Sequence, residues 1–161
     1  MSTDPPASPE IEARVGMFQD PLADWTSRMF SLVMDAKSII TVPAFPERLT
    51  AGWREVRGLA WTGRGRITRV EVSVDGGTSW RDATLDEPVL PKCHTRFRYP
   101  WRWSGEAAVL MSRATDETGY VQPTLDALMK ARGPQTQYHF NQIRAWRVAA
   151  DGVVTFAGAG A

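Results

Sequence analysis

The chain has 161 residues, of which 43% are hydrophobic and 23% charged, and this composition is typical of one globular domain with a short tail. Its 19 basic and 18 acidic residues leave a net charge of +1, which excludes the strongly basic footprint of a general nucleic-acid-binding protein. The single cysteine, Cys93, excludes an internal disulfide, and no hydrophobic run approaches the ~20 residues of a membrane-spanning helix.

Three parts are predicted along the chain. Residues 1–24 are expected to be a disordered leader, because their first stretch is rich in Pro, Ser and acidic residues and lacks the features of a secretory signal. Residues 25–46 are expected to form an extended arm and a first strand, since the arm ends in the β-branched run "SIITV". Residues 47–157 carry the pattern of a β-rich domain.

The segment "RITRVEVSVD" predicts a strand followed by a tight hairpin. Its valines are expected to face a core and its polar residues the opposite side: Val70, Val72 and Val74 against Arg69, Glu71, Ser73 and Asp75. The stretch Ser73–Trp80 also fits the Asp-box pattern Ser-x-Asp-x-Gly-x-Thr/Ser-Trp of sialidase propellers. A propeller needs repeated blades and this chain has no internal repeat, so we expect the stretch only to stabilise a hairpin.

The segment "TRFRYPWRW" separates aromatic residues from arginines. Strict alternation predicts Phe97, Tyr99, Trp101 and Trp103 on one face of a strand, with Arg96, Arg98 and Arg102 on the other. Two interpretations remain open: a strand with buried aromatics and a partner-facing arginine side, or an exposed surface on which single-stranded bases stack. The first keeps the aromatics in a core, and the second needs them exposed.

Only "TLDALMKARG" predicts a helix, which ends at Gly133. The segment "NQIRAWRVAADGVVTFAG" then predicts a strand, an Asp-Gly turn and a last short strand. About seven short strands with frequent turns predict an all-β, immunoglobulin-like antiparallel sandwich with one short helix. A small Greek-key barrel is the alternative.

Motifs for catalysis are absent from the sequence. Cys93 and His94 lack the second pair of ligands that a zinc site needs, and His139 lies 45 residues beyond His94. The sequence contains neither a nucleophile elbow nor a phosphate-binding glycine loop. We therefore expect no metal, no cofactor and no catalytic residue in the chain itself.

Several segments, in order, resemble the C-terminal domain of sulfite oxidase-type molybdenum enzymes. The resemblance covers about residues 25–156 and looks closest to the molybdenum subunit of the sulfane dehydrogenases of the thiosulfate-oxidising Sox system. The residues that carry it are Lys37-Ser38, the Gly-x-Ala-Trp-x-Gly stretch at Gly58–Gly63, Asp75-Gly76-Gly77 with Trp80, Trp101-x-Trp103 with Gly105, Ser112–Gly119, Gln122-Pro123 and Trp146.

This resemblance implies an immunoglobulin-like domain that pairs two subunits as a homodimer and has no catalysis of its own. It also implies a separate, larger domain that holds molybdopterin and molybdenum, which is not contained in these residues. Sulfite or sulfane sulfur as substrate, a c-type cytochrome partner and a periplasmic parent enzyme follow from the same resemblance, although the chain shows no signal peptide. Neither nucleic acid nor membrane is an expected partner.

Two groups of residues are candidate sites. In eukaryotic sulfite oxidases an arginine shortly before the terminal "AWHRV"-like segment helps to bind the anionic substrate, and His139 falls at that place, with Arg144 nearby. These two residues are therefore candidates for contact with an anion. Arg96, Arg98 and Arg102 are candidates for a partner-facing surface. An alternative function is a stand-alone binding module that uses the Arg/aromatic strand 96–103.

Overall fold

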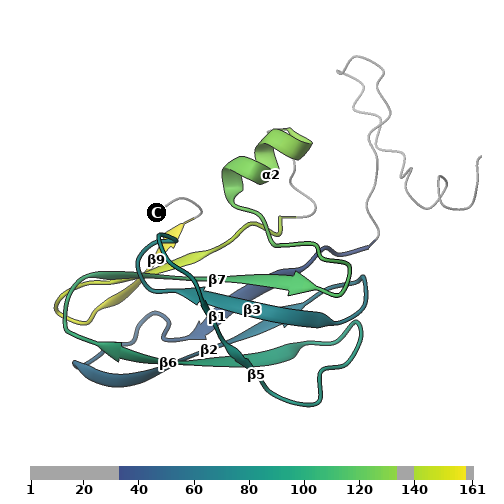
Figure 1. Ribbon diagram of the computed structural model, residues 1–161. Coiled ribbons are helices and arrows are strands. Elements are labelled where there is room, and N and C mark those ends of the chain that lie inside the picture. The colour runs from purple at the N-terminus through teal and green to yellow at the C-terminus, as the bar shows by residue number, and fades with distance from the viewer. Residues whose placement is uncertain (1–32, 134–139, 159–161) are drawn as a thin grey trace, which may run out of the picture. The chain divides into compact units, whose positions relative to one another are not determined.

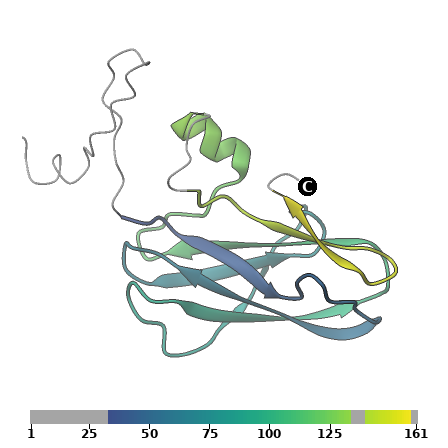
Figure 2. The ribbon, with the colours of Figure 1, turned by 180° about the vertical axis from the view of Figure 1, so that it is seen from behind.

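A computed structural model describes residues 33–133 and 140–158, and all of its elements belong to one compact unit that begins at Asp35. Two antiparallel sheets are stacked as layers, and the helix lies outside them (Figures 1 and 2). The elements in chain order are β1 (Lys37–Val42), β2 (Gly52–Trp61), β3 (Ile67–Ser73), β4 (Arg81–Asp82), β5 (Thr84–Leu85), β6 (Thr95–Trp103), β7 (Ala108–Asp116), α2 (Leu125–Arg132), β8 (Ala145–Val148) and β9 (Val154–Gly158).

The order of the strands is that of an immunoglobulin-like sandwich. One sheet runs β1-β2-β6-β5, and the other runs β4-β3-β7-β8-β9. With β1, β2, β6 and β5 as strands A, B, E and D, and β3, β7 and β8 as C, F and G, these are the ABED and CFG sheets of the immunoglobulin fold. The predicted all-β sandwich is confirmed, and the barrel alternative is wrong, because the strands form two separate sheets. The strand count among the described residues exceeds the predicted seven because short β4 and terminal β9 extend the second sheet.

The core lies between the two sheets, and β6 contributes its largest side chains. Phe97, Trp101 and Trp103 are buried on the inner face of β6, while the arginines of the same strand are exposed, which confirms the predicted alternation. Val56 on β2 and Leu110 on β7 pack into the same core. Phe97, Trp101 and Trp103 are therefore inside the domain, and Tyr99 is half-buried against the core.

Gly58 lets the aromatic core approach the backbone. It lies directly opposite Phe97 on the neighbouring strand. A Cβ atom at position 58 would lie 2.2 Å from the carbonyl oxygen of Ile39 and 2.3 Å from Cζ of Phe97. Only glycine leaves room for both neighbours, so this position is fixed by close packing.

The hairpin at Ser73–Trp80 is held by its own side chains. Asp75 accepts hydrogen bonds from Ser79 Oγ at 2.6 Å, from Ser79 N at 2.9 Å and from Ser73 Oγ at 2.7 Å. These bonds, those of Ser79 above all, lower the pKa of Asp75 to about 2. Gly76 and Gly77 have φ values of 71° and 91°, and Trp80 Nε1 donates to the carbonyl of Gly77 at 3.0 Å. The prediction of a structural hairpin is confirmed.

The alternation predicted for β3 needs one qualification. Val70 and Val72 are buried as predicted, but Glu71 and Ser73 on the other side of β3 are also buried. Glu71 is covered because Arg113 forms two bonds to it, of 2.7 and 3.0 Å. Ser73 is covered because it bonds the hairpin that folds back at Asp75.

The helix forms as predicted, but the strand that follows it begins later than predicted. The helix is confirmed, with Thr124 as N-cap and Gly133 as C-cap. The strand predicted to begin at Asn141 begins at Ala145 instead, because the side chains before it are used in buried polar contacts described below. The leader (residues 1–24) and the arm up to residue 32 lie outside the described residues.

Candidate functional sites at the polar end and on the arginine face

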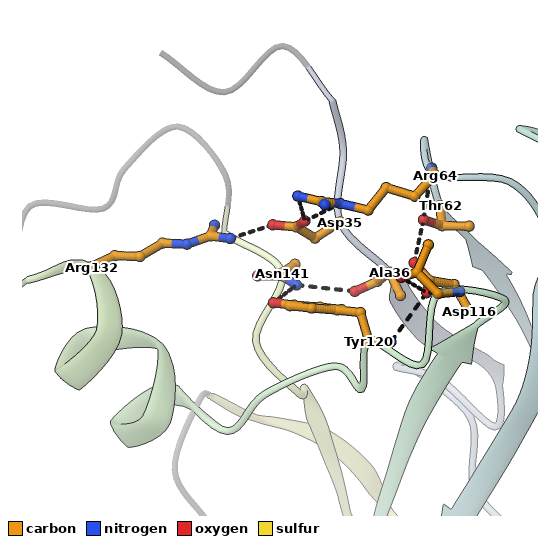
Figure 3. A network of polar contacts seen from close by, with 9 residues as sticks. Asp35, Ala36, Thr62, Arg64, Asp116, Tyr120, Arg132 and Asn141 are labelled. Carbon is orange, nitrogen blue, oxygen red and sulfur yellow. Dashed lines mark hydrogen bonds and ion pairs between the residues drawn. The ribbon is translucent and has the colours of Figure 1, made fainter. Parts of the chain in front are cut away.

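Four chain segments meet at one end of the sandwich and form what we call the polar end: residues 35–37, 62–66, 116–122 and 140–144 (Figure 3). They come from the segment that leads into β1, the β2–β3 turn, the β7–α2 connection and the segment that leads into β8. Because regular strands stop here, the backbone cannot satisfy all polar groups, and side chains take over that role.

Asp35 is a fully buried charged group of the polar end, and its side chain has no solvent exposure. Arg64 Nε donates to Asp35 Oδ1 at 3.0 Å, and Arg64 Nη2 forms an ion pair with the same oxygen at 3.0 Å. Arg132, from the last turn of α2, donates to Asp35 Oδ2. A buried carboxylate is tolerated only when it is paired and hydrogen-bonded, so Asp35 ties α2 and the β2–β3 turn to the start of β1.

Asp116 holds the turn that follows β7. Its Oδ1 accepts from Thr118 N at 3.0 Å, from Thr118 Oγ1 at 2.6 Å and from Tyr120 N at 3.2 Å. Its Oδ2 accepts from Thr62 Oγ1 at 2.9 Å. Asn141 Nδ2 then joins Tyr120 Oη at 3.1 Å to the carbonyl of Ala36 at 3.0 Å. The network spans segments that are far apart in sequence.

Gln122 is the hub that joins the two sheets. Its Oε1 accepts from Ser38 N at 2.8 Å, from Ser38 Oγ at 2.7 Å and from Ala114 N at 3.2 Å. Its Nε2 donates to the carbonyl of Gln142 at 3.2 Å. The side chain thereby satisfies the backbone of the edge strand β1, where no neighbouring strand can do so.

Two cations of the polar end lie close to each other without a carboxylate. Lys37 Nζ donates to the carbonyl of Phe140 at 2.9 Å, and Arg144 stacks on the rings of Phe140 and Phe156 at 5.2 and 5.7 Å. Burial and, second, the positive charge of Arg144 lower the pKa of Lys37. Within residues 33–133 and 140–158, neither cation forms an ion pair. An anion placed here would find two donors already in position.

The arginine face is the outward side of β2 and β6. We define it by its exposed arginines, Arg57 on β2 and Arg96, Arg98 and Arg102 on β6. Their opposite neighbours follow from the register: Arg102 faces Trp53, Arg98 faces Arg57, and Arg96 faces Leu59. Glu55 pairs with Arg57 at 3.5 Å and Asp86 with Arg98 at 3.0 Å. In the described part of the chain, Arg96 and Arg102 form no ion pair, so this face carries more positive than negative charge.

The described candidate residues from the sequence lie at two separate sites. Arg144 lies at the polar end beside Lys37. From the sequence, Lys37 was noted only as one of the residues that carry the family resemblance. His139 lies outside the described residues. Arg96, Arg98 and Arg102 lie together on another surface and are exposed, as the prediction of a partner-facing side requires. No group of three or more His, Cys, Asp or Glu side chains suited to a metal ion is found among the described residues.

Comparison with known proteins then decides the family. Residues 28–145 match the family model described as the Mo-co oxidoreductase dimerisation domain. The chain belongs to this family. The match covers the strands from β1 to β7 and the helix, so it includes both the polar end and the arginine face.

Relatives of this dimerisation domain are larger enzymes. The chain is 32% identical to the mitochondrial sulfite oxidase of Rattus norvegicus over 129 residues, which are 70% of this chain and 23% of that protein. It is 37% identical to the NADH nitrate reductase of Solanum lycopersicum over 105 residues, which are 56% of this chain and 12% of that protein. The chain therefore spans less than a quarter of the length of either relative.

A solved structure agrees with the fold and with the resemblance noted in the sequence. The sulfane dehydrogenase SoxCD from Paracoccus pantotrophus contains a chain that is 50% identical to this one, with a TM-score of 0.78. The match covers 81% of this chain and 34% of that chain. Within the described residues, no helix is long and apolar enough to cross a membrane.

Proposed function

We propose that this chain pairs two copies of a molybdenum-dependent oxidoreductase of the sulfite oxidase type, as a homodimer, without carrying out catalysis itself. The observation that carries the proposal is the family match over residues 28–145, which includes most strands of the two-sheet sandwich. The similarity to a sulfane dehydrogenase, at 50% identity, supports oxidation of sulfite or sulfane sulfur as the reaction of the parent enzyme.

The other parts of that enzyme follow from the same relatives. Molybdopterin with molybdenum would be held by a separate catalytic domain or subunit, since the relatives extend far beyond the part that this chain matches. The resemblance to Sox sulfane dehydrogenases supports a c-type cytochrome partner and a periplasmic parent enzyme. A stand-alone module that stacks nucleic-acid bases on strand 96–103 has less support, because Phe97 and Trp101 are buried.

The mass of the chain in solution tests the homodimer. Light scattering coupled to gel filtration, at high micromolar concentration, should give twice the 17.9 kDa mass of one chain. A standard homodimer buries about 1,600 Å2 in total and does not dissociate at such concentrations. A mass of one chain at high micromolar concentration would contradict the proposed function.

A second role is proposed for the polar end, namely a contact with the anionic substrate through Lys37, Arg144 and His139. The specific observation is the pair of neighbouring cations, Lys37 and Arg144, that lack a carboxylate partner in the described residues. His139 comes directly before Phe140, whose carbonyl accepts from Lys37. A sulfur oxyanion would offset the repulsion between the cations, which no group described in the chain does.

NMR titration of the lysine side chains tests this role. Replacing Arg144 by Met should raise the pKa of Lys37, because the nearby positive charge is removed, and saturating sulfate or sulfite should raise it in the unmodified chain. Lys130, exposed on α2, is the internal control, and its NMR signal should respond neither to Arg144→Met nor to the anion. A pKa of Lys37 that responds neither to Arg144→Met nor to the anion would contradict the role.

A further inference from the structure

The four arginines of the arginine face project from two neighbouring strands of one sheet, in a chain whose net charge is only +1. The carboxylates paired with them number two, Glu55 and Asp86, so two positive charges remain in excess on this surface. Arg57 and Arg98 stand directly opposite each other across the strands. Like charges in such a pair are unfavourable, and the ion pairs to Glu55 and Asp86 offset their repulsion.

We propose that the arginine face binds an acidic protein surface and that the homodimer forms elsewhere on the domain. This inference goes beyond the proposed function, which concerns pairing of identical chains. An interface between two identical chains related by a two-fold axis places the same patch on both sides. Two copies of the arginine face would bring excess positive charge against excess positive charge, so this face is unsuited to that role.

The composition of the face fits a protein partner. Arginine and tryptophan are enriched at protein interfaces, and Trp53, at 69% exposure, lies directly opposite Arg102. Guanidinium groups bind carboxylates through two parallel hydrogen bonds, which gives a preference for discrete acidic side chains. Leu59, half-buried beside Arg96, adds an apolar contact within the same row.

A nucleic acid fits the face less well. Phe97, Trp101 and Trp103 of β6 are buried in the core on the side opposite the arginines and are not available for base stacking, and Tyr99 is half-buried on that same side. Glu55 and Asp86 lie among the arginines and would repel the continuous negative charge of a phosphate backbone. An acidic protein surface can place its carboxylates opposite Arg96 and Arg102 and avoid these two positions.

The size of the face indicates a transient complex. Strands of ten and nine residues make the surface about 30 Å long, and with β1 beside β2 it is about 15 Å wide. A contact of this size buries on the order of 900 Å2 in total, at the low end for specific protein complexes. The complex should therefore form rapidly and weaken strongly with salt.

Calorimetric titration of the full chain tests the proposal, with a synthetic peptide of alternating Glu and Ala residues as the probe. The peptide should bind at about 50 mM salt and at least tenfold more weakly at about 200 mM. The double variant Arg96→Glu with Arg102→Glu should weaken binding about tenfold or more. Arg81→Glu with Arg147→Glu is the matched control, because it makes the same change in charge at exposed positions of the other sheet, and it should stay within about twofold.

Four results would overturn the proposal. One is the absence of peptide binding at low salt, and another is equal binding by the Arg96/Arg102 variant and the unmodified chain. A third is tighter binding of a single-stranded oligonucleotide of equal net charge that depends on the same two arginines, which would assign the face to nucleic acid. The fourth is a folded but monomeric Arg96/Arg102 variant beside a dimeric unmodified chain, which would assign the face to the homodimer. A monomeric unmodified chain that still binds the peptide would contradict the proposed function alone.

Discussion

The polar end and the arginine face use charged residues in opposite ways. At the polar end, the carboxylates of Asp35 and Asp116 are buried, and each accepts hydrogen bonds from at least two other residues of the chain. On the arginine face, exposed cations exceed their carboxylate partners. Burial forces a polar group to find its partners within the chain, whereas exposure leaves a cation available to another molecule. The buried carboxylates of the polar end therefore stabilise the fold, whereas Arg96 and Arg102 of the arginine face remain available for recognition.

The largest effect is expected at the buried hub of the polar end. Gln122→Ala removes the acceptor of two buried backbone N–H groups, those of Ser38 and Ala114, and should reduce the free energy of unfolding by about 3–5 kcal/mol. Urea unfolding measures the change. Val121→Ala, at the exposed neighbouring position, should cost no more than about 0.5 kcal/mol. A decrease in the free energy of unfolding of less than about 1 kcal/mol for Gln122→Ala would show that other groups can replace the hydrogen bonds of Gln122.

A smaller loss is expected when the buried carboxylate is removed. Asp35→Ala leaves Arg64 and Arg132 without their common acceptor, but both arginines are partly exposed and can turn to water. We therefore expect a loss of about 2–3 kcal/mol, below the full cost of breaking a buried pair. The control is Glu117→Ala, which removes an exposed ion pair to Arg66 at the same end and should cost about 0.5 kcal/mol or less. If Asp35→Ala and Glu117→Ala reduced the free energy of unfolding equally in urea unfolding, the proposed difference between buried and exposed carboxylates would be contradicted.

The hairpin at Ser73–Trp80 sharpens the comparison, because Asp75 is exposed and yet satisfied within the chain. Its pKa is lower in the folded than in the unfolded state, so its contribution to stability is present above about pH 4 and is lost as the pH falls towards about 2. Urea midpoints between pH 5 and pH 2 should decrease less steeply in Asp75→Asn than in the unmodified chain. Parallel curves for the two proteins would mean that the bonds to Asp75 form equally in the unfolded chain.

The smallest effect on stability is expected on the arginine face. Arg96→Glu with Arg102→Glu should change the free energy of unfolding by no more than about 0.5 kcal/mol, since neither side chain has an ion pair in the described residues. Thermal unfolding measures it, in the same samples that are used for peptide binding. A loss of more than about 2 kcal/mol would mean that these arginines serve the fold and not recognition.

The sequence predicts well those features that depend on residues close together in the chain. The alternation in β6 separates Phe97 from Arg96 and Arg98 because neighbouring residues of a strand point to opposite faces, and the structure agrees. The turn at Gly76-Gly77 follows from the residues themselves, which adopt positive φ. The family resemblance, confirmed by the match over residues 28–145, was likewise carried by local segments in a fixed order.

The sequence does not predict the polar end, because its contacts join distant segments. Gln122 bonds Ser38 across 84 positions, and Arg132 bonds Asp35 across 97. The periodicity of the sequence does not show that such a residue is buried. The pattern that predicted the helix likewise did not show that Arg132 contacts Asp35. Glu71 was predicted only to lie on the side opposite the valines, and its burial was not predicted for the same reason, since the cover that Arg113 provides comes from a different strand. Sequence patterns thus locate faces, whereas buried polar partners require the assembled fold.

Hydroxyl-radical footprinting of the homodimer tests the central claim most directly, namely that the arginine face stays open when two copies pair. Trp53 reports on this face, since 69% of its surface is exposed in the single chain. We predict that its oxidation rate changes less than about twofold between concentrations at which the chain is monomeric and dimeric, while side chains on another surface become protected. Protection of Trp53 by about fivefold or more on dimerisation would place the homodimer contact on the arginine face and contradict the account.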